Sequence, residues 1–186
     1  YFGTASGHHK FKISFSGCPL DCARTREMDL GFQGIIEPQV DANLCNACNL
    51  CVINCDEKAL TMVNDLPVMD KNKCNYCGDC IKVCPIDAMV PARKGWLVRV
   101  GGKHGKHPYF AYEIVQFATD EQCHALIGET ILWYQANAVG RERIGLTIER
   151  LGLSKFLDEV VKPLGLEVMV TSGERKRFWT AGNLYN

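Results

Sequence analysis

The chain has 186 residues, of which 47% are hydrophobic, and its 21 basic and 21 acidic side chains leave a formal net charge of zero. This length and composition allow one domain of ordinary size with a packed core and a second, smaller domain. The charge balance gives no indication of a nucleic-acid partner, and the sequence contains no apolar run of about eighteen residues that would span a bilayer.

The first predicted element is a β-strand at residues 9–16, where phenylalanine and isoleucine alternate with lysine and serine. This period of two is typical of a strand with one buried face. Lys10 and Lys12 therefore share one face of the strand. Cys18 has the same parity and would lie on that face as well if the extended geometry continued that far.

A short cysteine pair follows the strand in the stretch GCPLDC. Cys18 and Cys22 are separated by three residues, a spacing that suits two ligands of one metal cluster at a turn of the chain. Cysteine is also a common buried core residue. The pair by itself therefore leaves both interpretations open.

Eight of the eleven cysteines lie in CNACNLCVINC and, eighteen residues later, CNYCGDCIKVCP. Each run has the spacing C-x2-C-x2-C-x3-C, in which three thiolates of one tight loop bind three irons of a cubane and the fourth cysteine reaches the other cluster. The pattern predicts two 4Fe–4S clusters with exchanged ligands. The first would be held by Cys45, Cys48, Cys51 and Cys84, and the second by Cys74, Cys77, Cys80 and Cys55.

Zinc and disulfides are the alternative interpretations of these cysteines. Zinc binds two pairs of ligands across a longer loop, which gives no reason for a third and fourth cysteine so close behind each pair. Disulfides need an oxidising compartment, whereas cluster thiolates fit the reducing cytoplasm that we expect here. Residues 41–92 resemble bacterial-type two-cluster ferredoxins. Asp56 follows Cys55 in place of a proline, and its charge would lower the potential of the second cluster.

The stretch after the cysteine runs is basic. A strand is predicted at residues 95–100 from its tryptophan, leucine and valine content, and it leads into the glycine-rich loop VGGKHGKHP. The backbone N–H groups of this loop, with Lys103 and Lys106, could approach an anion closely. An ordinary solvated turn with surface lysines is the alternative.

Helices are predicted for most of the carboxyl-terminal part. Thr119 and Gln122 form a capping box for a helix that runs to about residue 138. A second helix is expected at residues 141–150, and Ser154 would cap a third. A short strand is expected at residues 166–170. The apolar face of the first helix would contain Leu126, Ile127, Ile131 and Leu132, and we interpret Cys123, Trp133 and Tyr134 as core residues.

Taken together, KFKISFSGCPLDCARTREMDLGFQG (10–34) and GWLVRVGGKHGKHP (95–108) resemble the sirohaem-dependent sulfite and nitrite reductases. The resemblance is closest to anaerobic and dissimilatory sulfite reductase subunits and covers almost the whole chain. It implies an α+β fold in which a small two-cluster ferredoxin-like domain interrupts a sulfite/nitrite reductase-type domain. The implied parts are 1–40 and 93–186 for the reductase domain and 41–92 for the inserted domain.

In that family a 4Fe–4S cluster is held by a C-x5-C pair and a later C-x3-C pair, whose last cysteine bridges the cluster and the sirohaem iron. The resemblance therefore implies that Cys18 is a cluster ligand and that Cys22 also binds the haem iron. It further implies that Lys10 and Lys12 are catalytic, because they would neutralise the bound oxyanion and help to supply protons.

The basic loop acquires a role from the same resemblance, because buried sirohaem carboxylates need cationic or N–H partners. Lys103 and Lys106 would be such partners. Two features depart from the family pattern: Leu20 stands in place of an asparagine, and no C-x5-C pair is present outside the two ferredoxin-like cysteine runs. Since the sequence also begins at Tyr1 and not at a methionine, we expect it to be the carboxyl-terminal part of a longer subunit.

These observations predict part of a sulfite reductase subunit, an oxidoreductase that in its complete form reduces sulfite to sulfide with six electrons. An electron-donor protein or subunit would feed the two clusters, and other reductase subunits are expected as partners, without nucleic acid or a membrane span. Nitrite reduction on the same cofactor is the alternative within the family. An electron-transfer module without substrate chemistry is the alternative from another class, because the ligands of the coupled cluster are incomplete.

Overall fold

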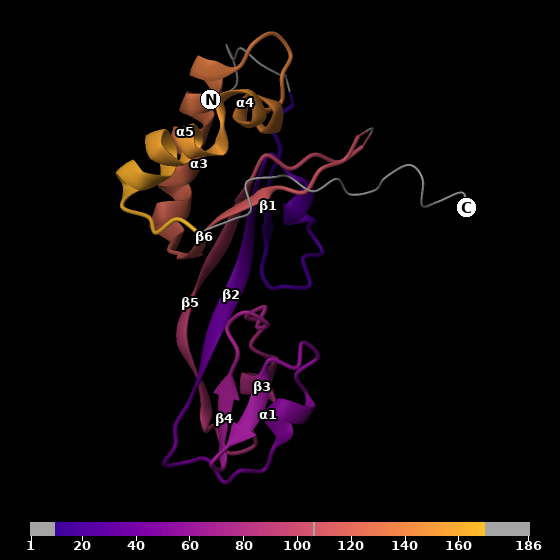
Figure 1. Ribbon diagram of the computed structural model, residues 1–186, viewed down its shortest axis with the longest axis vertical. Coiled ribbons are helices and arrows are strands. Elements are labelled where there is room, and N and C mark those ends of the chain that lie inside the picture. Colours follow the sequence, from indigo (N-terminus) through magenta and orange to yellow (C-terminus); the bar gives the residue numbers. More distant parts are fainter. Residues whose placement is uncertain (1–9, 106, 170–186) are drawn as a thin grey trace, which may run out of the picture. The chain divides into compact units, whose positions relative to one another are not determined.

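The computed structural model describes residues 10–105 and 107–169 (Figure 1). The chain divides into two compact units, a smaller one at Gly34–Gly95 and a larger one formed by the residues before and after it. Two long strands, β2 (Leu30–Val40) and β5 (Met89–Val100), each begin in one unit and end in the other. The fold is α+β, as the sequence predicts.

The sheet of the larger unit has the strand order β1-β2-β5-β6. Its outer strands are β1 (Ile13–Ser16) and β6 (Tyr112–Ala118). β1 pairs in parallel with β2, and β6 pairs antiparallel with β5. The strand predicted at residues 95–100 is confirmed as the end of β5.

The first predicted strand is shorter than its alternating pattern indicates. β1 begins only at Ile13, and His9 lies outside the described residues. Its alternation also fails at the end, because Phe15 is 48% exposed and Ser16 is buried. The Ser16 hydroxyl donates a hydrogen bond to the carbonyl of Cys18, 3.2 Å away, and the chain bends there. The extended geometry therefore stops before Cys18, and the parity argument that linked it to the lysines is wrong.

The capping box is confirmed. Helix α3 (Asp120–Asn137) begins after Thr119, whose hydroxyl accepts from the N–H of Gln122 while the Gln122 side chain accepts from the N–H of Thr119. The buried positions of α3 include Cys123, Trp133 and Tyr134, as predicted. The prediction that Leu132 lies on the apolar face is wrong, because this side chain is 53% exposed.

Two shorter helices follow, α4 (Ile144–Leu151) and α5 (Leu153–Phe156), and the chain continues through a π-helical turn at Leu157–Val161. The prediction that Ser154 caps a helix is wrong, because it lies inside α5 after Gly152 at the N-cap. Instead of the predicted strand at 166–170, the described residues form a single bridge between Val168 and Val115.

The core of the larger unit joins its helices to its sheet. Leu30, Val98 and Ile114 from the strands are buried together with Leu126 and Ile148 from the helices. Figure 1 shows α3, α4 and α5 gathered beside these strands. None of the helices in the described part of the chain is long and apolar enough to cross a membrane.

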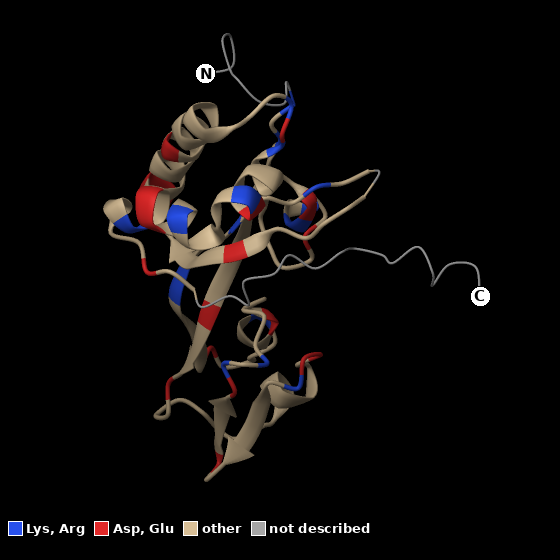
Figure 2. Ribbon diagram, turned by 45° about the horizontal axis from the view of Figure 1, so that its top comes forward, with Lys and Arg blue, Asp and Glu red and all other residues tan. Residues whose placement is uncertain are grey.

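The smaller unit contains a hairpin and two single-turn helices. The hairpin pairs β3 (Leu60–Val63) with β4 (Leu66–Met69), and the helices are α1 (Leu50–Ile53) and α2 (Asp79–Lys82). Acidic and basic residues are interspersed along the described chain (Figure 2), in line with its net charge of zero.

Candidate iron–sulfur site

Four cysteines of the smaller unit line one pocket that is partly open to solvent. They are Cys45, Cys48, Cys51 and Cys84, the set predicted for the first cluster. The remaining wall is mostly apolar and includes Leu50, Met62 and Pro67. In the described part of the chain, no three His, Cys, Asp or Glu side chains are close enough together to hold a single metal ion.

The loop that carries the first three of these cysteines has an unusual backbone. Ala47 and Asn49 both have positive φ angles, 57° and 66°. The second cysteine run repeats this geometry at the equivalent positions, with φ angles of 59° at Tyr76 and 77° at Gly78. A left-handed conformation costs a residue other than glycine roughly 1–2 kcal/mol. Ala47, Asn49 and Tyr76 all adopt this conformation. Both loops therefore need the same backbone turn, which directs the loop around its thiols.

The second set of cysteines lies in the same unit. The thiols of Cys55, Cys74 and Cys77 each accept a backbone N–H, from Ala59 at 3.3 Å, Tyr76 at 3.4 Å and Asp79 at 3.5 Å respectively. Such N–H···S contacts stabilise negative charge on a thiolate and are among the features that set cluster potentials.

The electrostatic environment differs among the thiols. Burial, with a contribution from the neighbouring Cys77, raises the pKa of Cys80 to about 12. Burial alone would also raise the pKa of Cys84, but backbone N–H groups from Ile86, Ala88 and Met89 outweigh it and lower that pKa below its ordinary value. Thiolates in the buried positions therefore need a cation or a cluster as a partner.

Cys18 and Cys22 lie in the larger unit and are both exposed. The turn that carries them is built by Asp21, whose N–H donates to the Cys18 carbonyl at 3.1 Å. The Asp21 carboxylate accepts the N–H of Thr25 at 2.8 Å at the start of the 3-10 helix η1 (Thr25–Glu27). The alternative interpretation of this pair as buried core cysteines is wrong, since neither thiol is in the core.

Two glycines hold η1 in place. A Cβ atom on Gly31 would lie 2.2 Å from the Thr25 carbonyl oxygen, and one on Gly102 would lie 2.6 Å from the carbonyl oxygens of Arg26 and Met28. Only glycine allows this close approach of backbone to backbone. Gly102 of the glycine-rich loop thus has a packing role, and anion binding by that loop stays a prediction.

A buried arginine supports the same region. Arg99 is 1% exposed, and its Nη1 donates to Thr25 Oγ1 at 2.9 Å and to Gln33 Oε1 at 2.6 Å. Its Nε donates to Glu113 Oε1 at 2.8 Å. Sequence reasoning missed this residue, which stands in a basic stretch that resembles a solvated surface. The signal for burial is that the residues around it, 96–100, are otherwise continuously apolar, as in a strand buried on both faces.

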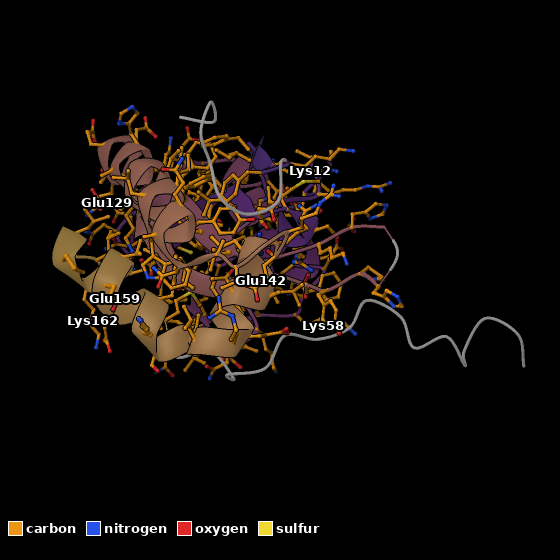
Figure 3. All side chains as sticks on the ribbon, turned by 90° about the horizontal axis from the view of Figure 1, so that it is seen from above. Lys12, Lys58, Glu129, Glu142, Glu159 and Lys162 are labelled. Atoms are coloured by element: carbon orange, nitrogen blue, oxygen red, sulfur yellow. The ribbon has the colours of Figure 1, made fainter. Side chains whose placement is uncertain are left out.

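The structure describes three of the four lysines for which the sequence predicts a catalytic or cofactor-binding role. Lys10 and Lys12 are exposed, and Figure 3 labels Lys12. The backbone N–H of Lys12 donates to Asp29 Oδ2 at 2.9 Å, and Arg143 donates to the same buried carboxylate. Lys103 forms an antiparallel bridge with Tyr109, whereas Lys106 lies outside the described residues.

The family model for the nitrite and sulphite reductase 4Fe–4S domain matches residues 1–168. The chain therefore belongs to this family. A crystal structure of dissimilatory sulfite reductase I has a similar fold, with a TM-score of 0.63 at 19% identity over 92% of this chain and 46% of that one.

Two curated relatives carry more sequence similarity. The coenzyme F420-dependent sulfite reductase of Methanocaldococcus jannaschii is 34% identical over 162 residues, which are 86% of this chain and 26% of that protein. A subunit of the anaerobic sulfite reductase of Salmonella typhimurium is 29% identical over 178 residues, 90% of this chain and 52% of that protein. The chain thus spans between a quarter and about half of the length of these relatives.

Proposed function

We propose that the chain is part of a sulfite reductase subunit that reduces sulfite to sulfide, with electrons that pass through two 4Fe–4S clusters of the smaller unit. The observation that carries the proposal is the pocket around Cys45, Cys48, Cys51 and Cys84. It unites the last cysteine of the second run with three cysteines of the first, as ligand exchange between two clusters requires.

The residues of the smaller unit fit such clusters. Thiols supply the ligands, backbone N–H groups donate to three of the sulfur atoms of the second set, and the wall of the first pocket is mostly apolar. When bound, the clusters would supply one-electron transfer at low potential. The protein contributes the ligand geometry, the hydrogen bonds and the dielectric environment that set this potential.

We place the sirohaem-linked site at the turn of Cys18 and Cys22 in the larger unit. The turn offers two exposed thiols, half of the set that a coupled 4Fe–4S cluster needs, and the other described cysteine of that unit, Cys123, is buried in the core. In the complete subunit, Lys10 and Lys12 would face the substrate oxyanion, with Lys103 and Lys106 toward sirohaem carboxylates. Both lysines carry a positive charge and are exposed, which is compatible with this role.

The same assignment extends to the domains and the partners. The smaller unit, which contains residues 41–92, would be a ferredoxin-like insert that divides the reductase domain into the parts 1–40 and 93–186. An electron-donor protein or subunit would reduce it in the cytoplasm, within a larger assembly of reductase subunits. Nitrite reduction is a second candidate, favoured by the family that the chain belongs to. An electron carrier is a third candidate. It is favoured because the ligand sets of the two ferredoxin-type clusters are complete, whereas the set for the sirohaem-linked cluster is not.

The first test is metal content. The purified chain should contain about eight iron and about eight acid-labile sulfide, because two complete cysteine sets hold two cubanes. Cys84→Ser should reduce the iron to about four, while the matched Cys22→Ser should leave it unchanged. Stoichiometric zinc in a colourless protein would refute the cluster assignment.

The second test separates a reductase from a carrier. The subunit extended to the full length of its relatives should show a sirohaem spectrum and reduce sulfite with a dye donor. In that protein, Lys10→Met or Lys12→Met should lower turnover about a hundred- to thousandfold, because each removes a preorganised charge at the oxyanion. Wild-type turnover of both variants with full sirohaem content would contradict the assignment of the lysines.

A further inference from the structure

We propose that Glu37 on β2, together with Arg93 and Lys71, sets the reduction potential of the cluster held by the second cysteine set, and so distinguishes it from the first. The inference rests on the proposed function, since it requires the two clusters. It concerns a residue that lies outside both cysteine runs.

The backbone brings Glu37 to the loop of the second run. The N–H of its neighbour Ile36 donates to the carbonyl of Tyr76 at 2.9 Å, and the Ile36 side chain lies 3.3 Å from the position of a Cβ on Gly78. The N–H of the same Tyr76 donates to the Cys74 thiol. The backbone of β2 at Ile36 therefore lies against the loop 74–78, which carries two of the four ligands, and Glu37 is the next residue of that strand.

The Glu37 carboxylate is held by two cations. Arg93 Nε donates to its Oε2 at 2.6 Å, and Lys71 Nζ is 3.2 Å from its Oε1. The Glu37 side chain is only 12% exposed, whereas Arg93 and Lys71 are 54% and 69% exposed. The anion is thus the buried member of the group, and the two cations are the solvated members.

This difference in burial decides which charge acts more strongly on the cluster. Solvent and salt weaken the effect of the exposed cations without removing it, and they weaken that of the less exposed carboxylate to a smaller extent. The charge of Glu37 is among those that raise the pKa of Cys74, after burial itself and Cys55. A nearby anion that disfavours a thiolate also disfavours an added electron on the cluster that the thiolate binds.

The first cysteine set has a different neighbour. The carboxylate that acts on Cys84 is Asp87, which is exposed. Its charge is open to water and salt, so its influence on a cluster should be weaker than that of Glu37. The two clusters are therefore expected to differ in potential for a reason that the doubled cysteine motif does not contain.

The test is a potentiometric titration of the purified, cluster-loaded chain, followed by electron paramagnetic resonance. Glu37→Gln should move one of the two reduction waves to a more positive potential and leave the other in place. Arg93→Gln should move the same wave in the opposite direction, because it leaves the carboxylate with one cation fewer. The double variant should return that wave toward its wild-type position.

Asp87→Asn is the matched control, because it removes one carboxylate from the neighbourhood of the other cysteine set. It must not move the wave that Glu37→Gln moves. The inference would be overturned if Glu37→Gln retained its iron and sulfide and neither reduction wave shifted. If Glu37→Gln loses its iron, an unshifted wave in Arg93→Gln overturns it instead. A wild-type chain without cluster signals would refute the proposed function itself.

Discussion

The two units of the chain are stabilised by different means. In the larger unit, strands and helices bury a continuous core that includes Phe32, Val98 and Phe156. In the smaller unit, the corresponding buried cluster among the described residues is Leu60, Cys80 and Met89, with several cysteines packed around it. A unit of this size with so small an apolar core needs another source of folding free energy.

Metal binding is the source that the smaller unit offers. Its two cysteine runs bring eight thiols into one short segment, and a cluster that binds the folded but not the unfolded segment stabilises the fold by its binding free energy. The larger unit has an apolar core and buried polar groups of its own. Loss of the clusters should therefore unfold one unit and leave the other intact.

The largest predicted effect is that of metal removal. After chelation under reducing conditions, amide exchange in β3 and β4 should accelerate about a thousandfold, which corresponds to a loss of about 4 kcal/mol of local stability. The tryptophan emission should keep its folded wavelength, because the two tryptophans among the described residues, Trp96 and Trp133, both lie in the larger unit. Exchange in β6 serves as the internal control. Equal loss of protection in β6 would show that the larger unit depends on the clusters as well.

The sequence predicts local features better than distant ones, because a local feature depends only on a few consecutive residues. The cysteine spacing is local, as is the capping box of α3, so both can be read from a few consecutive residues. The misassignments of Phe15, Leu132 and Ser154 concern which face of an element is buried or where an element begins. Those features depend on neighbours from distant parts of the chain, such as Phe32, which stacks on Phe15 at 4.5 Å.

The residues of the candidate sites also differ in whether a local pattern predicts them. The two cysteine sets come from motifs, but Arg99 and Asp29 act through partners far away in sequence. Arg99 bonds to Thr25 and Arg143 bonds to Asp29, across 74 and 114 residues. No local sequence pattern predicts such pairs. Glu37 is likewise separated by 56 residues from its partner Arg93. Its position near the second cysteine run depends on the packing of β2, which no local sequence pattern indicates.

The second prediction concerns the buried polar network of the larger unit. Arg99→Met keeps much of the stem packing but leaves Gln33 and Thr25 buried without their donor. We expect a loss of about 2–3 kcal/mol of unfolding free energy, below the full cost of a broken buried ion pair because Glu113 is partly exposed and can rehydrate. Urea unfolding followed by tryptophan fluorescence measures this loss.

Two controls accompany Arg99→Met and test whether the two units fold independently. Glu113→Gln should also cost about 2–3 kcal/mol, because it leaves the buried Arg99 guanidinium without this carboxylate partner. Iron content of Arg99→Met should stay at the wild-type value, because the cysteine sets lie in the other unit. A variant that loses iron along with stability would show that the two units do not fold independently.

The smallest predicted effect is that of the ion pair that joins the end of α3 to α4. Arg150 donates from Nε and Nη2 to the Glu142 carboxylate, at 3.0 and 2.9 Å, and from Nη2 to the Asn137 carbonyl at 2.8 Å. Figure 3 labels Glu142. The hydrogen bond from Arg150 is the largest cause that lowers the pKa of Glu142 to about 2; burial opposes it, and Val139 and Thr147 add to it.

A carboxyl group whose pKa is lower in the folded state stabilises the fold above its unfolded pKa of about 4.3, and this contribution disappears as the pH falls through the folded pKa. Because solvent partly screens Arg150, which is 39% exposed, we expect Glu142→Gln to cost only about 1 kcal/mol at pH 7. The difference between wild type and variant should shrink between about pH 4.3 and pH 2. Urea unfolding of both proteins at pH 7 and at pH 3 tests this, because acid-labile clusters affect both alike and cancel in the difference. A difference that is the same at pH 3 as at pH 7 would mean that the hydrogen bonds of Glu142 stabilise the loop without a contribution from its charge.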